Sequence, residues 1–169
     1  LPSGYDLGID TLAFASAIAP TVTTMKLLAA IRCGEMWVPQ LARQLATINQ
    51  ILNGRLSINI ISSEMPGEIL DGPSRYARTL ETMTALRTLL SGQRLDIDGE
   101  HLQLHVDAPR ICRDSPSAPP FYFGGLSNEA RDVAAAGADV YLMWPDTEDV
   151  IAETITDLQT RASSYGRTL

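Results

Sequence analysis

Histidine, cysteine and aromatic residues are all scarce in this 169-residue chain. It contains two histidines, two cysteines and only 6% aromatic residues. Cys33 and Cys112 form no CxxC motif and lack the spacing of zinc ligands, which argues against a redox pair or a structural metal site. We therefore expect two reduced thiols, no bound metal and a cytoplasmic protein.

Basic clusters, long apolar runs and common catalytic motifs are missing as well. The formal net charge is −7 and no cluster of Lys and Arg is visible, whereas nucleic-acid binders carry a basic patch. No apolar run is long enough to span a bilayer. The chain has no Walker motif, no dinucleotide-binding GxGxxG and no recognisable Ser-His-Asp set. We expect neither a nucleic acid nor a membrane as a partner.

The sequence has the pattern of one α/β domain over residues 1–169, with 45% hydrophobic and 20% charged residues. Short apolar segments alternate with amphipathic ones. The expected strands are Lys26–Arg32, Ser57–Ile61, Phe121–Phe123 and Val140–Met143. The expected helices are Pro39–Leu52, one from Ser74 to Gly92, one from Ser127 to about Gly137, and one capped by Thr147 with an apolar stripe of Ile151, Ile155, Leu158 and Ala162.

A β-hairpin interrupts this alternation. Apolar and polar residues alternate on both sides of Asp98-Gly99, which predicts a hairpin over Arg94–Asp107 with its turn at that dipeptide. The order of strands and helices predicts parallel strands that are adjacent in chain order, and both a doubly wound sheet and a barrel fit it. A complete (β/α)₈ barrel needs about 250 residues, so a barrel here would be partial, with a further strand stub at Leu1-Pro2.

The most informative segment is the strand that ends in a glycine pair and turns into a helix. Gly124 and Gly125 have no Cβ, so the backbone can approach a ligand closely. Ser127 stands where an N-cap belongs, and a helix that starts there directs free N–H groups and the positive end of its dipole at the glycines. This arrangement suits an anion, most often a phosphate, although a plain tight turn fits the same residues.

Five segments together resemble the bacterial luciferase-like flavin monooxygenases, and most of all the FMNH₂-dependent alkanesulfonate monooxygenases. They are KLLAAIR (Lys26–Arg32), ARQLATINQILNGRLSINII (Ala42–Ile61), SRYARTLE (Ser74–Glu81), DGEHLQL (Asp98–Leu104) and PPFYFGGLSNEARDVAAAGADVYLMW (Pro119–Trp144). They follow the family's order at nearly its spacing. The resemblance implies a partial TIM (β/α)₈ barrel of the luciferase-like type with an inserted β-hairpin. The chain begins at Leu1 without Met, and it ends before the strand on which the family places its catalytic Arg and His. We therefore expect the first strand and the C-terminal strands of the full barrel to lie outside it.

The resemblance also implies a cofactor and the residues that hold it. Family members use reduced FMN, supplied by a separate NAD(P)H:flavin reductase, to activate O₂. Tyr76 matches the family tyrosine that contacts the flavin phosphate, and the turn with Gly124, Gly125 and Ser127 matches the phosphate cradle. The family turn is usually GGSS, and here Leu126 replaces its first serine, which removes one hydroxyl.

The substrate side of the family site is represented by fewer residues. The alkanesulfonate enzymes cleave a C–S bond to give sulfite and an aldehyde. Arg32 and Trp144 match positions at the C-terminal ends of barrel strands, where active sites collect, and a guanidinium suits a sulfonate. The family's catalytic Arg and His belong to a strand beyond the last helix of this chain, so no catalytic residue is assigned.

Simpler roles fit several of these residues. Tyr76 could pack on its own helix, Arg32 could form a salt bridge at the rim, and Trp144 could anchor a loop. His101 and His105 are four residues apart, but we expect them on the polar face of a hairpin strand, where exposure to solvent explains them better than a metal ion does.

Two classes of function follow. The first is an FMNH₂- and O₂-dependent monooxygenase that acts on an alkanesulfonate or a similar small organic substrate. The second is a non-catalytic flavin-binding or interaction protein on a truncated luciferase-like barrel. An open partial barrel exposes strand edges and apolar residues of its inner face to water, so we also expect a homo-oligomer.

Overall fold

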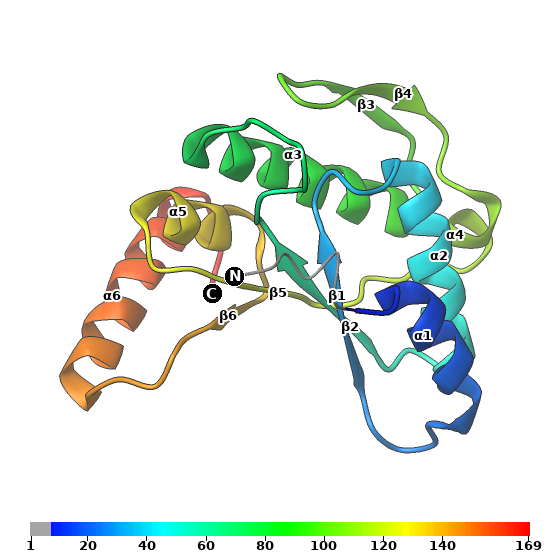
Figure 1. Cartoon of the computed structure of the whole chain (residues 1–169), viewed down its shortest axis with the longest axis horizontal. Helices are drawn as coiled ribbons and strands as arrows, with labels where there is room; N and C mark the ends of the chain where they lie inside the picture. The colour runs from blue at the N-terminus through cyan, green and yellow to red at the C-terminus, as the bar shows by residue number, and fades with distance from the viewer. Residues whose placement is uncertain (1–7) are drawn as a thin grey trace.

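Four strands form one parallel sheet in the computed structural model, which describes residues 8–169 (Figure 1). Their order in the sheet is β1-β2-β5-β6, and each strand pairs in parallel with the next. The strands are β1 (Leu27–Arg32), β2 (Leu56–Ile61), β5 (Phe121–Gly124) and β6 (Val140–Leu142). All four predicted strands are confirmed, in the predicted order. The order never reverses, as it does in a doubly wound sheet, so it favours the partial barrel. The predicted stub at Leu1-Pro2 lies outside the described residues.

Helices precede, connect and follow these strands (Figure 1). They are α1 (Thr11–Ile18), the 3₁₀ turn η2 (Ala19–Thr21), α2 (Val38–Ile51), α3 (Gly72–Leu90), α4 (Arg110–Asp114), α5 (Asn128–Gly137) and α6 (Glu148–Ser164). Helix α4 packs against α2 and α3, and α6 packs against α5. The four predicted helices are confirmed as α2, α3, α5 and α6. In residues 8–169, no helix is long and apolar enough to cross a membrane.

Two helices were not predicted, for different reasons. Helix α1 consists mostly of small and apolar residues and has no charged face, so it shows little helical periodicity. Its local signal is Asp10, whose carboxylate accepts the N–H of Ala13 at 2.6 Å as an N-cap. Helix α4 has only five residues, too few for a periodic pattern to be recognised.

Two details of the predicted helices were wrong. Helix α3 begins at Gly72 rather than Ser74, because Asp71 is the N-cap and accepts the N–H of Ser74 at 2.8 Å. In α6, Ile155 is exposed rather than part of the apolar stripe, and Thr154 is buried instead. The stripe was therefore placed one residue too far along at this turn.

The predicted hairpin is present, but its turn is longer than expected. Strands β3 (Leu95–Asp98) and β4 (Gln103–Val106) pair antiparallel, and Asp98 is paired with Gln103. Four residues therefore connect the strands, instead of a two-residue turn at Asp98-Gly99. The carboxylate of Glu81 on α3 accepts the N–H groups of Glu100 at 2.9 Å and His101 at 3.0 Å, so the turn is shaped by a contact from another element.

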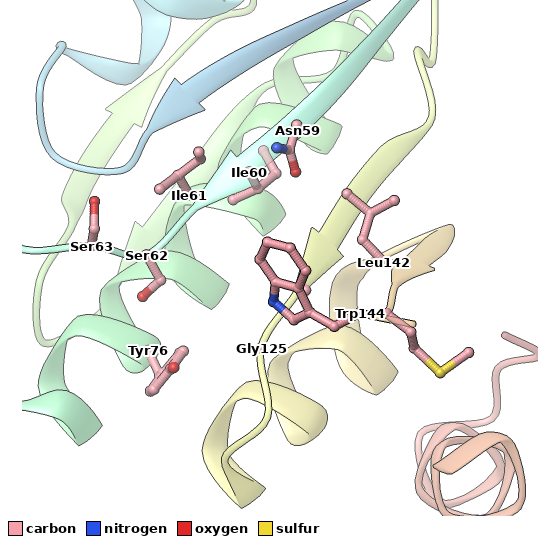
Figure 2. Close-up of a pocket in the computed structure, with 11 residues that line it drawn as sticks. Asn59, Ile60, Ile61, Ser62, Ser63, Tyr76, Gly125, Leu142 and Trp144 are labelled. Atoms are coloured by element: carbon pink, nitrogen blue, oxygen red, sulfur yellow. The ribbon is translucent and has the colours of Figure 1, made fainter. Parts of the chain in front are cut away.

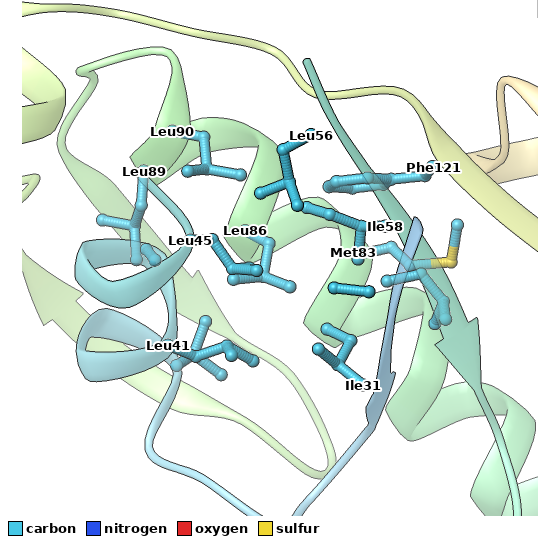
Figure 3. Packing of buried hydrophobic residues seen from close by; sticks show 14 of the residues in the cluster. Ile31, Leu41, Leu45, Leu56, Ile58, Met83, Leu86, Leu89, Leu90 and Phe121 are labelled. Carbon is cyan, nitrogen blue, oxygen red and sulfur yellow. The ribbon is translucent and has the colours of Figure 1, made fainter. Parts of the chain in front are cut away.

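The hydrophobic core lies between one face of the sheet and the helices. Figure 3 shows side chains of α2 and α3 packed against side chains of the strands. The strand residues on this face are buried: Ala29, Ile31, Leu56, Ile58, Ile60, Phe121 and Phe123. Burying large apolar side chains is the main favourable term in folding, so this layer holds the sheet in place. The site described next lies at the C-terminal ends of the same strands.

Candidate functional site

A pocket of ≈ 480 Å³ lies at the C-terminal ends of β2, β5 and β6 (Figure 2). It is the site at which sheets built from β/α units usually bind their ligands. Ser62 and Ser63, in the loop after β2, line one part of it, and Tyr76 on α3 lies beside them. The turn at Gly125 and the Trp144 side chain after β6 line the rest. The pocket thus joins segments that are far apart in the sequence.

The glycine pair is required by close packing in this turn. A Cβ on Gly124 would lie 2.6 Å from the carbonyl oxygen of Leu142, and one on Gly125 would lie 2.6 Å from Cβ of Ala130. Ser127 is the N-cap of α5, as predicted, and its hydroxyl accepts the N–H of Ala130 at 3.2 Å. The turn therefore brings bare backbone to the pocket at the N-terminus of a helix, which is favourable for an anion.

Tyr76 lies next to this turn. Its ring packs edge-on against Phe123, with ring centroids 6.5 Å apart. Its Oη lies 3.7 Å from the position that a Cβ on Gly125 would occupy. The structure thus brings three of the predicted cofactor residues, Tyr76, Gly124 and Gly125, to one pocket, with Ser127 at its border as the cap of α5.

Ser62 and Ser63 were missed by the sequence analysis. Both hydroxyl oxygens are buried, and neither has a hydrogen-bond partner among residues 8–169. Buried polar atoms without a partner are rare in folded proteins, and each calls for an explanation such as a missing ligand or water. Two serines after an apolar strand give a weak sequence signal, which becomes meaningful only when the fold places this segment at the pocket, with the hydroxyl of Ser62 directed toward Tyr76 and that of Ser63 directed away from it (Figure 2).

The two predicted substrate residues are in different positions. Trp144 lines the pocket and is 79% exposed. Arg32 ends β1 and does not line the pocket, although its side chain is only 17% exposed. Within the described part of the chain its Nε and Nη1 atoms are buried without a hydrogen-bond partner, and Glu35 Oε1 lies 3.5 Å from Nη1 as an ion-pair contact without hydrogen-bond geometry. Arg32 therefore keeps unused donors at the same end of the sheet.

The remaining titratable side chains do not form a metal or thiol site. Within residues 8–169, no group of three or more His, Cys, Asp or Glu side chains could hold a metal ion. Cys33 and Cys112 are both free and buried, and burial raises the pKa of Cys33 to about 11, which makes it an unreactive thiol. His101 belongs to the hairpin turn rather than to a strand and is half-buried, with its Nε2 atom buried, so its predicted strand position and its predicted exposure were both wrong. His105 is an exposed residue of β4, as predicted.

Comparison with known proteins covers nearly the whole chain. The family model of luciferase-like monooxygenases matches residues 2–169. A sulfoquinovose monooxygenase of Novosphingobium aromaticivorans is 56% identical over 176 residues, which span 100% of this chain and 49% of that protein. A second sulfoquinovose monooxygenase, from Agrobacterium fabrum, is 42% identical over 170 residues and spans 99% and 44%. The crystal structure of a riboflavin lyase with a modified FMN and riboflavin matches with a TM-score of 0.84 at 16% identity, covering 99% of this chain and 45% of that one.

These matches agree with the resemblance that the sequence segments indicate. The chain spans about half the length of the curated relatives it matches, in line with a partial barrel. The likeness to the riboflavin lyase concerns the fold. The family model and both relatives match over essentially all of the residues, and on that evidence the chain belongs to the luciferase-like monooxygenase family.

Proposed function

We propose that this chain provides the phosphate-binding end of the flavin site in a monooxygenase that uses reduced FMN and O₂. The observation that carries the proposal is the pair of buried, unpaired hydroxyls of Ser62 and Ser63, which share a pocket with Tyr76 and the Gly124-Gly125 turn. A phosphate is an acceptor of several hydrogen bonds, and it would use donors that the protein itself leaves unused.

The residues of the pocket would divide the work of holding FMN. The hydroxyls of Ser62, Ser63 and Tyr76 would donate hydrogen bonds to the phosphate, and the N-terminus of α5 would add its dipole. The bare backbone of the glycine turn would let the phosphate approach closely. Leu126 supplies no hydroxyl, so the serines after β2 would take over a donor role at this site. When bound and reduced, FMN supplies the electrons that activate O₂.

For the substrate we propose an organosulfonate, cleaved at its C–S bond to give sulfite and an aldehyde. The two relatives described above are sulfoquinovose monooxygenases, so a sulfonated sugar is the first compound to test. Arg32 has buried donors without a partner and would contact the sulfonate, whose oxygens match a guanidinium in geometry. The exposed indole of Trp144 would pack on the substrate at the mouth of the pocket.

The partners and location of the protein remain predictions. A two-component reaction of this kind needs an NAD(P)H:flavin reductase as a transient partner. The homo-oligomer stays a prediction as well. Two free thiols are compatible with the predicted cytoplasmic location.

Sulfite release tests the proposed reaction. The purified full-length protein is supplied with reduced FMN, O₂ and either sulfoquinovose or a simple alkanesulfonate. We expect sulfite in stoichiometry with FMNH₂-dependent O₂ use, and a strong loss in kcat/KM for Arg32→Ala that Arg32→Lys restores only in part. A protein that binds FMN but releases sulfite from none of these compounds would instead be a non-catalytic flavin-binding protein.

A further inference from the structure

An ion pair lies behind the loop that carries the two pocket serines. The loop of residues 62–71 starts with Ser62 and Ser63 and leads from β2 to α3. Arg78 on α3 contacts Glu68 of this loop with two nitrogens: Nη1 bonds to Oε1, and Nη2 lies 3.0 Å from Oε2. The two side chains are only 12% and 19% exposed. A two-pronged pair of this kind fixes geometry in addition to contributing energy.

The same carboxylate closes a turn within the loop. The N–H of Glu68 donates to the carbonyl of Met65 at 3.0 Å, and the N–H of Met65 lies 3.4 Å from Glu68 Oε2. Gly67 has a φ of 80°, which allows the chain to reverse there. A Cβ on Gly34 would lie 2.9 Å from Arg78 Nη1 and 2.9 Å from Cε of Met65. The ion pair therefore links the loop after β2 to α3, and the loop after β1 packs closely against it at Gly34.

This connection determines how the pocket donors lie relative to one another. Strand β2 holds Ser62 from one side, and the closed turn at Met65 holds the chain just beyond Ser63. Tyr76 precedes Arg78 by two residues on α3. Hydrogen bonds from Arg78 lower the pKa of Glu68, so its carboxylate stays ionised at neutral pH. The spacing between the serine hydroxyls and the tyrosine phenol thus depends on a pair that does not itself line the pocket.

We propose that Arg78 and Glu68 are positioning residues that hold the loop so that Ser62 lies opposite Tyr76, and that they set the preference of the pocket for a flavin with a phosphate over one without it. This inference rests on the proposed function, because it requires that the pocket binds the phosphate of FMN. It assigns a binding role to two charges that lie outside the pocket.

Comparing FMN with riboflavin, which lacks the phosphate, tests this role. Each reduced flavin is titrated anaerobically into the purified full-length protein. For Glu68→Gln, which keeps the size of the side chain, we expect the affinity for FMN to fall about tenfold, the scale of one charge-assisted hydrogen bond, while the affinity for riboflavin stays within about twofold. Arg78→Lys keeps the charge but loses the two-pronged geometry, so its loss should be smaller and again specific to FMN.

Glu64→Gln is the matched control. Glu64 belongs to the same loop as Glu68 and pairs with Arg75 of α3 at 3.0 Å, but it is 71% exposed. Removing its charge should therefore change neither the FMN affinity nor the riboflavin affinity. An FMN affinity that Glu68→Gln leaves unchanged, or equal losses for both flavins, would overturn the inference. If Glu68→Gln does not fold, the same comparison on Arg78→Lys decides the question. A wild-type protein that binds FMN no tighter than riboflavin would contradict the phosphate pocket itself, whatever the variants do.

Discussion

Two pockets at opposite ends of the parallel strands differ in how their polar groups are satisfied. At the C-terminal ends, the hydroxyls of Ser62 and Ser63 are buried and have no hydrogen-bond partner in the part of the chain that the structure describes. At the N-terminal ends, a pocket of ≈ 380 Å³ is lined by Arg87 and Arg167. Both of these arginines are already engaged: Arg87 lies 3.0 Å from Asp139, and Arg167 donates to two backbone carbonyls at 2.9 and 2.7 Å.

Asp139 does not line the N-terminal pocket, but it binds both of the arginines that do. Its Oδ2 accepts the N–H of Phe121 at 2.8 Å, at the start of β5, and its Oδ1 lies 3.5 Å from Arg167. The guanidinium of Arg87 also stacks 4.5 Å above the Phe121 ring. Positive charge alone would therefore select the N-terminal pocket, which is not the proposed phosphate site. Donors already in use stabilise the fold, whereas the unused hydroxyls at the C-terminal ends are the ones that the proposed function assigns to the phosphate.

The largest expected effect is on stability, at the N-terminal pocket. Asp139→Ala leaves the N–H of Phe121 and part of Arg87 and Arg167 unpaired, so the free energy of unfolding should fall by about 2–3 kcal/mol. The affinity for FMN should not change. Urea denaturation measures the first and flavin titration the second. Asp132→Ala, which removes a more exposed partner of Arg161, is the control and should cost about 0.5 kcal/mol. A loss of FMN affinity in Asp139→Ala would remove the distinction between the pockets.

The next effect is on flavin binding rather than on stability, and it concerns the C-terminal pocket. Tyr76→Phe removes one hydrogen bond to the phosphate, so binding of reduced FMN should weaken by about 2 kcal/mol. The phenol oxygen makes no hydrogen bond that the fold needs, so the unfolding free energy should stay nearly constant. Riboflavin titration is the internal control. Equal FMN binding by the variant and the wild type would exclude Tyr76 from the phosphate site.

A smaller effect is expected for Ser62→Ala. FMN binding should weaken by about 1.5 kcal/mol, because one charge-assisted donor is lost. Stability should stay the same or rise slightly, since the variant removes a buried hydroxyl that has no partner. Urea unfolding measures the change in stability, and FMN titration measures the change in affinity. If the variant is instead destabilised and binds FMN normally, the hydroxyl serves the fold and not the ligand.

The smallest effect concerns His105 on the exposed hairpin, in neither pocket. Its ring nitrogens lie 3.2 Å from Asp96 Oδ1 and 3.0 Å from Asp98 Oδ1, and hydrogen bonds to these carboxylates raise its pKa above the ordinary value of 6.5. Arg94 also pairs with Asp96 and with Asp107 on the neighbouring strand end. Because the folded pKa is raised, the stabilisation is complete below pH 6.5 and is lost as the pH rises through the folded value.

Melting temperatures measured between about pH 5 and about pH 8 test this sign. The wild type should melt slightly above His105→Gln at the acidic end, and the difference should disappear at the basic end. A difference that does not depend on pH would mean that His105 contributes through packing rather than through its charge.

Much of this fold could be predicted from local sequence patterns. The four strands are short apolar runs bounded by polar or turn residues, and Leu41, Leu45 and Ile48 on α2 recur at helical spacing, so run length identifies the strands and periodicity identifies the helix. Helix α1 and the length of the hairpin turn could not be predicted in this way. Helix α1 lacks a polar face, and the turn is shaped by Glu81, a residue distant in sequence.

The site was predictable only in part, for a related reason. The glycine turn and the Ser127 cap are local signals, and Tyr76 came from the family resemblance. Ser62 and Ser63 became visible only because the fold leaves their hydroxyls buried and without partners, a property that no sequence pattern carries. Arg32 is at the predicted end of its strand, and its substrate role stays a prediction.

The position of the phosphate in a crystal structure of the protein with bound FMN tests the central claim most directly. We predict that the phosphate oxygens lie within about 3 Å of the hydroxyl oxygens of Tyr76 and of Ser62 or Ser63, beside the N-terminus of α5. A phosphate bound between Arg87 and Arg167 would contradict the account, because it would mean that charge, and not unused donors, selects the site.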